Sequence, residues 1–229
     1  MTTRRFLAFA ALLLAAACST VNYQSPQFAE RARHHQIIAV LPFEMVLTGD
    51  PPRDLTADQI ARIEEAESVA FQEAYYNRLL HQSSVHRKHP IQIEIQPVDT
   101  TNSLLEAAGI GVRESWAMSA KSLASVLRVD AVISTSVQKT RYLSDGESFG
   151  LDLGLQVVNE VTEGALAPVL PWGLVKTHDI WANCELIDSV DGAVLWQTDL
   201  AQATDWRYPA NQVIAGFTEE LAKKFPYRG

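Results

Sequence analysis

The chain has 229 residues, of which 47% are hydrophobic and 20% are charged, and its formal net charge at pH 7 is −8. This length suits one domain or at most two small ones, and the hydrophobic content is sufficient for a packed core, which excludes an intrinsically disordered chain. Because the charge balance is acidic and no basic patch with interleaved aromatic residues is present, we expect no nucleic-acid partner.

The first 20 residues have the pattern of a secretory signal peptide that ends in a lipidation site. Arg4 and Arg5 form its positive region, and residues 6–14 form an apolar run too short to cross a bilayer as a stable helix. Residues 15–17 are alanines that lead directly into Cys18. This arrangement resembles the lipobox of bacterial lipoproteins, which implies removal of residues 1–17, attachment of a diacylglycerol to Cys18 and acylation of the new amino group. Two or more acyl chains anchor a protein stably to a membrane.

Two other interpretations of this leader remain open. An ordinary cleaved signal would release a soluble product, and a permanent membrane helix is disfavoured because the apolar run ends at residue 17. Ser19, in place of aspartate, resembles the pattern of lipoproteins exported to the outer membrane in enteric-type bacteria. We therefore expect a lipid anchor in the outer membrane, on its periplasmic side. Residues 18–35 are expected to be the lipidated N-terminus and a flexible tether that spans roughly 20–25 Å.

The domain is expected to span residues 36–229, and its first half alternates between strand and helix patterns. Runs rich in β-branched residues predict strands, and apolar residues at helical spacing predict helices. The expected elements are a buried strand at 36–43, a loop at 44–54, a helix at 56–80, a basic loop at 81–90, a half-buried strand at 91–98, a short helix at 99–109 that is capped by Asp99 and closed by Gly109, and a helix at 114–127. Thr56 and Gln59 have the spacing of a capping box. Glu64 and Glu67 are expected on a solvated face of the long helix.

The second half is expected to contain mainly antiparallel strands. The expected elements are strands at 129–143, 177–189 and 193–205 and a helix from 209 to 225. The first of these strands is expected to leave the core where it becomes charged at Lys139. Asp191-Gly192 between two alternating runs is a strong hairpin signal. If Cys18 is acylated, Cys184 has no disulfide partner, and its position on an apolar strand face favours a small buried residue over a nucleophile. The order of elements predicts an α/β (α+β) fold with a single mixed sheet and helices packed on it.

Residues 144–173, between two clear strands, are the least ordinary part of the chain. Apolar residues alternate from Phe149 to Val157, which favours a strand. The capping-box spacing of Ser144 and Glu147 favours a helix slightly, on which a stripe of glycines would let another backbone approach closely. The candidate contact residues for membrane lipid or a second copy are Gly146, Gly150, Leu151, Gly154, Leu155 and Trp172. The alternative is that this insert covers an open edge or face of the sheet, since apolar residues in a compact domain are usually core.

The sequence carries no recognisable motif for catalysis or for cofactor binding. A nucleophile elbow, a phosphate-binding loop and a dinucleotide-binding fingerprint are all absent. The three histidines within 81–90 and the adjacent pair His34 and His35 match no zinc-ligand spacing, and we expect the pair to be solvated. We therefore expect no catalytic residue, no cofactor and no metal site, and a protein that is not an enzyme.

Three stretches together resemble a known group of envelope proteins. They are Ile38-Ala-Val-Leu-Pro-Phe43, Arg128-Val-Asp-Ala-Val132 and Cys184-Glu-Leu-Ile-Asp-Ser-Val-Asp-Gly-Ala-Val-Leu-Trp196. Their order resembles that of periplasmic lipoproteins related to the curli-secretion lipoprotein and of the lipoprotein activators of peptidoglycan synthases. The resemblance implies an anticodon-binding-domain-like fold used for protein contacts or assembly. The curli channel uses two membrane hairpins per subunit, whereas only the insert is available here, which argues against a pore.

Three functions remain open on these grounds. The first is a lipid-anchored, non-catalytic interaction module with an unknown envelope protein as its partner. The second is an oligomeric component of an export or secretion system, in which residues 144–173 contact the membrane or a second copy. The third is an envelope hydrolase whose site is assembled from residues distant in the sequence.

Overall fold

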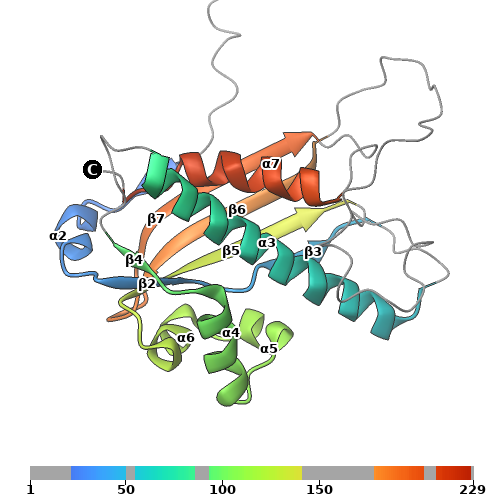
Figure 1. Cartoon of the computed structure of the whole chain (residues 1–229), viewed down its shortest axis with the longest axis horizontal. Helices are drawn as coiled ribbons and strands as arrows, with labels where there is room; N and C mark the ends of the chain where they lie inside the picture. The colour runs from blue at the N-terminus through green and yellow to red at the C-terminus, as the bar shows by residue number, and fades with distance from the viewer. Residues whose placement is uncertain (1–21, 50–54, 86–92, 141–177, 204–209, 228–229) are drawn as a thin grey trace, which may run out of the picture.

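A computed structural model describes residues 22–49, 55–85, 93–140, 178–203 and 210–227. They form one seven-stranded mixed sheet with helices packed on it (Figure 1), which confirms the predicted fold class. The strands are β1 (Asn22–Gln24), β2 (Ile37–Val40), β3 (Glu44–Leu47), β4 (Glu94–Ile95), β5 (Ala131–Lys139), β6 (His178–Asp188) and β7 (Val194–Ala203). The helices are α2 (Phe28–Ala32), α3 (Ala57–Val85), α4 (Val98–Ala107), α5 (Val112–Ala117), α6 (Ala120–Leu127) and α7 (Ala210–Lys223).

The strand order is β1-β7-β6-β5-β2-β4, and β3 also pairs with β5. The predicted hairpin is confirmed, because β6 and β7 pair antiparallel and Gly192 in their turn has a φ of +76° that favours glycine. Strand β5 is central, with β6 antiparallel on one side and β2 and β3 parallel on the other.

Residues 44–54 are not all loop, since Glu44–Leu47 form strand β3. Strands β2 and β3 lie in line along β5 and are interrupted at Pro42, which has no backbone N–H for a ladder. Ile38 and Glu44 are six residues apart, whereas their partners on β5, Ala131 and Ser136, are five apart. The interruption therefore inserts one extra residue in the manner of a β-bulge.

Helix α3 begins as predicted and then departs from the prediction in two ways. The Thr56 N–H donates to Gln59 Oε1 (2.8 Å) and the Gln59 N–H donates to Thr56 Oγ1 (3.3 Å), which confirms the capping box. The helix continues to Val85, so residues 81–85 are helical and not loop; the rest of that expected loop lies outside the described residues. Glu64 and Glu67, expected on a solvated face, are buried, because α5 and the end of β5 supply cations opposite them.

The region between β4 and β5 is more divided than predicted. Strand β4 has only two residues, and α4 begins directly after Pro97, so Asp99 lies in the first turn and is not the cap. Gly109 closes this part with a φ of +73°, as expected. The single helix expected at 114–127 is two helices, because Met118 is extended and the Ser119 side chain caps α6 by accepting from the Ser122 N–H at 3.2 Å.

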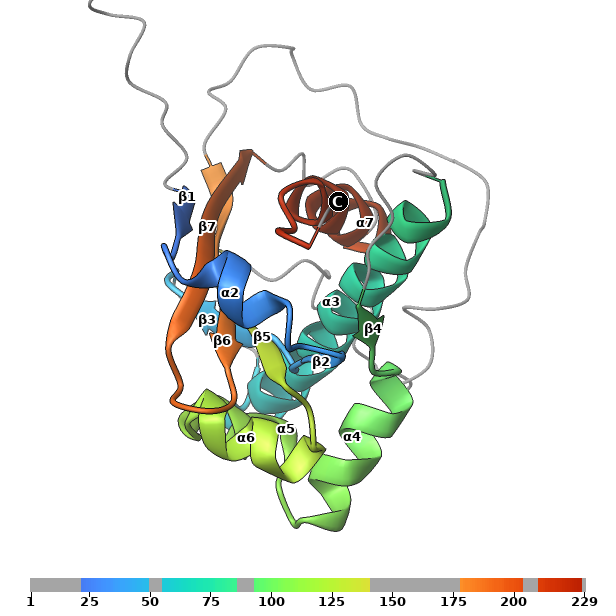
Figure 2. The same ribbon diagram turned by 90° about the vertical axis from the view of Figure 1, so that its left-hand side faces the viewer.

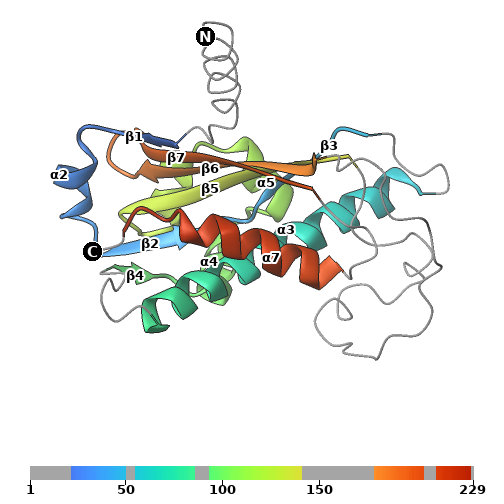
Figure 3. The same cartoon turned by 90° about the horizontal axis from the view of Figure 1, so that it is seen from above.

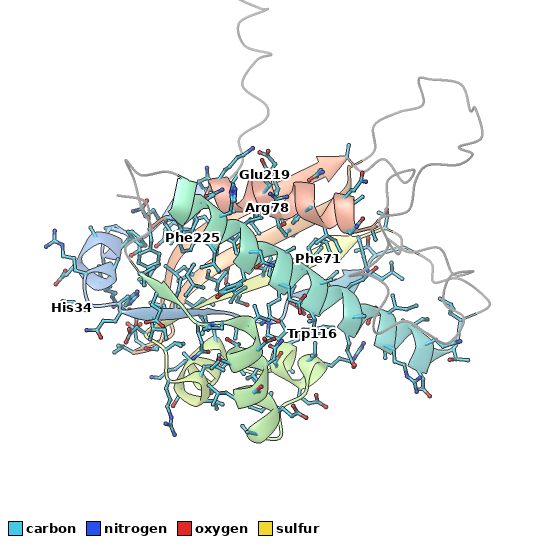
Figure 4. The ribbon with its side chains drawn as sticks, viewed as in Figure 1. His34, Phe71, Arg78, Trp116, Glu219 and Phe225 are labelled. Atoms are coloured by element: carbon cyan, nitrogen blue, oxygen red, sulfur yellow. The ribbon has the colours of Figure 1, made fainter. Side chains whose placement is uncertain are left out.

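Two apolar clusters lie on opposite faces of the sheet. Helices α3 and α7 cover one face together (Figures 2 and 3), with a core of stacked and edge-on rings that includes Phe43, Phe71 and Phe217. Phe71 and Phe225 are buried in this core, whereas the side chains of Arg78 and Glu219, labelled in Figure 4, are partly exposed and approach each other to 3.7 Å. Helices α4 and α6 form the second cluster on the other face, over Val132 and Ile187.

The N-terminal segment 22–35, expected to be tether, is part of the folded unit. Strand β1 pairs antiparallel with β7, and the Thr198 hydroxyl donates to Asn22 Oδ1 at 2.5 Å. Phe28 of α2 is only 7% exposed and its ring lies 5.5 Å from that of Tyr227. The prediction of a tether was wrong, because the polar composition of this stretch gave no sign of the buried Phe28 ring or of the edge strand β1.

Two sets of predicted site residues lie outside the described residues. These are Cys18 and the contact candidates of the insert, Gly146, Gly150, Leu151, Gly154, Leu155 and Trp172, which all remain predictions. Within the part of the chain that the structure describes, no helix has both the length and the apolar character required to span a membrane.

Candidate functional site

One part of the sheet carries no described helix on the face opposite α3 and α7. Helices α4 to α6 cover only the end of that face next to β2 and the hairpin turn (Figure 2). The strand register brings together the outward residues of β1, β3, β5, β6 and β7 here, and we call them the open face. Its members are Tyr23, Glu44, Val46, Ser134, Ser136, Gln138, Trp181, Asn183, Glu185, Gln197, Asp199 and Ala201.

The alternation of the strands explains why these residues face outward. On β5, Ile133 and Val137 point into the core under α3 and α7, and Ser134 and Ser136 therefore point to the opposite side. The same period places Cys184 in the core, where it is fully buried and accepts from the Thr135 hydroxyl at 3.3 Å. Burial raises the pKa of the Cys184 thiol to about 12, so it stays protonated and does not act as a nucleophile.

The open face combines exposed aromatic side chains with carboxylates. Trp181 is 37% exposed and Tyr23 is 45% exposed. Glu185 and Asp199 lie on neighbouring strands, and partial burial together with the charge of Asp199 raises the pKa of Glu185. The Asn183 amide donates to Asp199 Oδ1 at 2.8 Å, which holds that carboxylate on the face. All ionisable residues of the open face other than Tyr23 are acidic.

A small cavity of about 40 Å³ lies where the open face meets α5 and α6. Its lining includes Glu44 and Ser134 from the sheet and Trp116 and Met118 from the helices. Met118 is 36% exposed, and the Trp116 indole N–H is buried without a hydrogen-bond partner among the described residues. The cavity is large enough for a water molecule. It is too small for a drug-sized ligand.

A second feature is the set of buried charges between α3, α5 and β5. The Lys139 amine, whose residue is 1% exposed, forms an ion pair with Glu67, and Arg113 bonds Glu64 Oε2 at 2.6 Å while its guanidinium lies 5.3 Å from the centre of the Trp116 ring. Burial lowers the pKa of Lys139 to about 7, against the opposing attraction of Glu64. This arrangement ties the end of β5 to α3 and corrects the expectation that the strand leaves the core at Lys139.

A third feature is a group of contacts around Asp188, at the turn of the hairpin, that joins residues 31–35 to Tyr227. His35, expected to be solvated, is largely buried, with Nε2 at 3.5 Å from Asp188 and Nδ1 hydrogen-bonded to the Tyr227 hydroxyl. Arg31 of α2 bridges Asp188 at 3.4 Å and Asp191 at 2.7 Å. His34 remains exposed at the end of α2 (Figure 4).

The Tyr227–His35–Asp188 series has the order of a catalytic relay, but its electrostatics oppose that role. Burial raises the pKa of Tyr227, and the negative charges of Asp188 and Asp130 raise it further. A phenol of this kind holds its proton and does not become a nucleophile. These side chains instead have a structural role, since their contacts hold α2 against the turn between β6 and β7. Among the described residues, no group of three or more His, Cys, Asp or Glu could hold a metal ion.

Comparison with known proteins gives structural likenesses, among them three distant ones. No protein-family model matches the chain, and no curated protein matches it. The PelC dodecamer from Paraburkholderia phytofirmans is similar over 90% of this chain and 95% of that chain, with 14% identity and a TM-score of 0.42. Lipoprotein GNA1162 from Neisseria meningitidis is similar over 82% and 99%, with 12% identity and a TM-score of 0.39. The LpoB C-terminal domain from Salmonella enterica is similar over 78% and 94%, with 9% identity and a TM-score of 0.35. Likenesses this weak carry no functional argument.

Proposed function

We propose that this chain is a lipid-anchored lipoprotein of the outer membrane, facing the periplasm, and that it acts as a non-catalytic interaction module in the cell envelope. The observation that carries the proposal is the open face, where exposed Trp181 and Tyr23 lie among polar side chains on five neighbouring strands. Aromatic residues of this kind are enriched in protein–protein interfaces. The leader and Cys18 support the lipid anchor.

The open face supplies only part of the area that a protein partner of ordinary size would contact. Five strands, each about 4.8 Å wide, and three rows of side chains, each about 6.8 Å deep, cover an area of roughly 24 Å by 20 Å. This is somewhat more than half of the roughly 800 Å² that each partner contributes to a standard interface. The exposed Met118 at the rim extends the surface toward α5 and α6, so a partner of ordinary size would contact both the strands and this rim.

The direct test is a pair of photo-crosslinking variants of the full-length protein in cells. Gln138 on the open face and Gln212 on α7 are both exposed glutamines on opposite sides of the sheet, so each is replaced in turn by a photoreactive amino acid. We expect protein adducts from position 138 and far fewer from position 212. Equal adducts at the two positions, or none at 138, would contradict the use of this face.

The anchor is tested separately with Cys18→Ala. We expect the wild-type protein in the outer-membrane fraction and the Cys18→Ala protein outside it, since the two acyl chains are the expected membrane contact. Retention of Cys18→Ala protein in the outer-membrane fraction would refute the lipid anchor without affecting the crosslinking result.

A second candidate, an oligomeric export component, can be tested cleanly because of where the insert is attached. Lys139 at the end of β5 and Ile180 at the start of β6 are register partners, so both ends of the intervening stretch meet at one strand pair. Residues 144–173 can therefore be replaced by a short turn without changing the pairing of the sheet. If the insert makes oligomer contacts, this deletion should reduce the native mass in mild detergent to that of a monomer. An unchanged mass would remove this candidate.

A further inference from the structure

We propose that the open face binds a basic segment of a partner protein, rich in arginine or lysine, that is presented directly next to the membrane surface. The inference rests on the proposed lipid anchor for its position and on the charges of the face for its partner. Two independent observations carry it: the arrangement of carboxylates across the strands, and the short length of chain between Cys18 and β1.

The carboxylates of the open face are spread across the sheet. Register places Glu44, Ser136, Asn183 and Asp199 in one row that crosses β3, β5, β6 and β7. The two acids of this row are three strand spacings apart, about 14 Å. Glu185 lies in the neighbouring row, between them. Three acids over this distance match a segment that carries several cations and do not match a single bound ion.

The nearby cations of the described chain are engaged elsewhere, so they do not neutralise this face. Arg113 is paired with Glu64, and Lys139 is paired with Glu67 beneath the opposite face of the sheet. Lys224 donates to the main-chain oxygen of Asp199 at 3.0 Å and not to its carboxylate. Among the described residues, no cation forms an ion pair with Glu44, Glu185 or Asp199, which leaves these carboxylates for the cations of a partner.

Trp181 gives the face a preference among cations. It lies in the row next to Asn183, flanked by Gln138 on β5 and Ala201 on β7, and its ring is exposed. A guanidinium can stack on an exposed indole while its N–H groups bond a neighbouring carboxylate. This combination favours arginine over lysine at the centre of the partner segment.

The length of the N-terminal chain sets the position of the face. Only residues 19–21 separate Cys18 from β1, and Asn22 lies opposite Thr198, next to Asp199. Four extended steps reach at most about 14 Å. A lipid on Cys18 therefore keeps the β1–β7 edge of the face within that distance of the bilayer, well below the roughly 20–25 Å expected for a free tether. Anionic lipid headgroups would be repelled by the three acids, which favours a protein partner over the bilayer itself.

The test uses the full-length lipidated protein with the crosslinker at position 138, in two matched backgrounds. One carries Glu44→Gln, Glu185→Gln and Asp199→Asn. The other carries Glu94→Gln, Glu106→Gln and Glu220→Gln, three exposed carboxyls away from the open face. We expect the first background to lower the protein adduct about five- to tenfold and the second to leave it unchanged, with equal thermal melting temperatures. We also expect the crosslinked peptide to contain arginine or lysine at several positions.

A third variant carries a flexible 12-residue spacer between Val21 and Asn22. This variant should stay in the membrane fraction, but the yield of the protein adduct should fall. The reason is that the spacer no longer holds the open face at the same distance from the bilayer as the partner segment. An adduct that is insensitive to the open-face acids, an adduct to lipid only, or a crosslinked peptide without basic residues would overturn the inference while leaving the interaction module intact. Complete absence of an adduct at position 138 would instead refute the proposed function.

Discussion

The buried pair Glu67–Lys139 allows a sharp test of how the end of β5 is held against α3. Replacing Lys139 by Met keeps the length and apolar stem of the side chain but leaves the Glu67 carboxylate in a buried site without its cation. Removal of one member of a buried ion pair costs about 3–5 kcal/mol. We therefore expect Lys139→Met to lower the free energy of unfolding by that amount at pH 6, where the amine of the wild-type protein is charged.

The partner substitution separates loss of the pair from loss of packing. Glu67→Gln removes the carboxylate charge, so in the double variant Glu67→Gln/Lys139→Met no charge is left unpaired, and exchange of a buried pair for neutral groups is often close to neutral. We expect the double variant to be at least about 2 kcal/mol more stable than the sum of the single effects predicts. The assay is urea unfolding followed by circular dichroism, with equal m-values as the control for an unchanged folded state. Additive effects, or a Lys139→Met cost below about 1 kcal/mol, would refute the reasoning.

Three further predictions follow from single features. Burial lowers the folded-state pKa of Lys139 to about 7 from its ordinary 10.5, so the unfolded chain binds more protons than the folded chain between these pH values. The free energy of unfolding should therefore rise from pH 7 to pH 9, and it should rise less in Lys139→Met. Identical pH profiles for the two proteins would contradict the lowered pKa of Lys139. Phe28→Ala should cost about 3 kcal/mol in urea unfolding, because the ring is buried, whereas a residue in a tether would cost nothing. Gly192→Ala should lower the free energy of unfolding by about 1 kcal/mol, because Gly192 has a positive φ. Gly216→Ala should raise it by about 0.5–1 kcal/mol, because Gly216 lies within α7 without a close contact. Effects of the same sign at both positions would contradict the role of Gly192 in the turn.

Local signals predicted the parts of the fold that local chemistry determines. The Thr56–Gln59 capping box and the turn at Gly192 are read from adjacent residues, and both are present. Burial of Glu64 and Glu67 could not be read in this way, because it depends on Arg113 and Lys139, which are distant in the sequence. Whether the polar face of a helix is exposed or buried depends on which residues pack against it.

Two other differences between the predicted and the observed fold had weak signals in the sequence. Phe28 is a single aromatic residue in the polar stretch 22–35, and one buried ring together with a three-residue edge strand is enough to fix that stretch to the sheet. Ser119 followed by Ser122 inside an apparently continuous helix marks the break between α5 and α6. The open face could be anticipated from the alternation of Ser134, Ser136 and Gln138, but its extent needed the register of five strands.

The pairing of β1 with β7 constrains when this protein can complete its fold. Residues Asn22–Gln24 find their partners at Trp196–Thr198, and the His35 ring finds Tyr227 near the other end of the chain. A chain that is made and exported from its N-terminus must therefore wait until almost all of it has emerged before these contacts form. If the proposed leader directs export, this delay leaves the N-terminal segment accessible to modifying enzymes while the rest of the chain emerges. On that proposal, lipidation of Cys18 would precede closure of the sheet, and pairing of β1 with β7 would then bring the domain close to its lipid anchor.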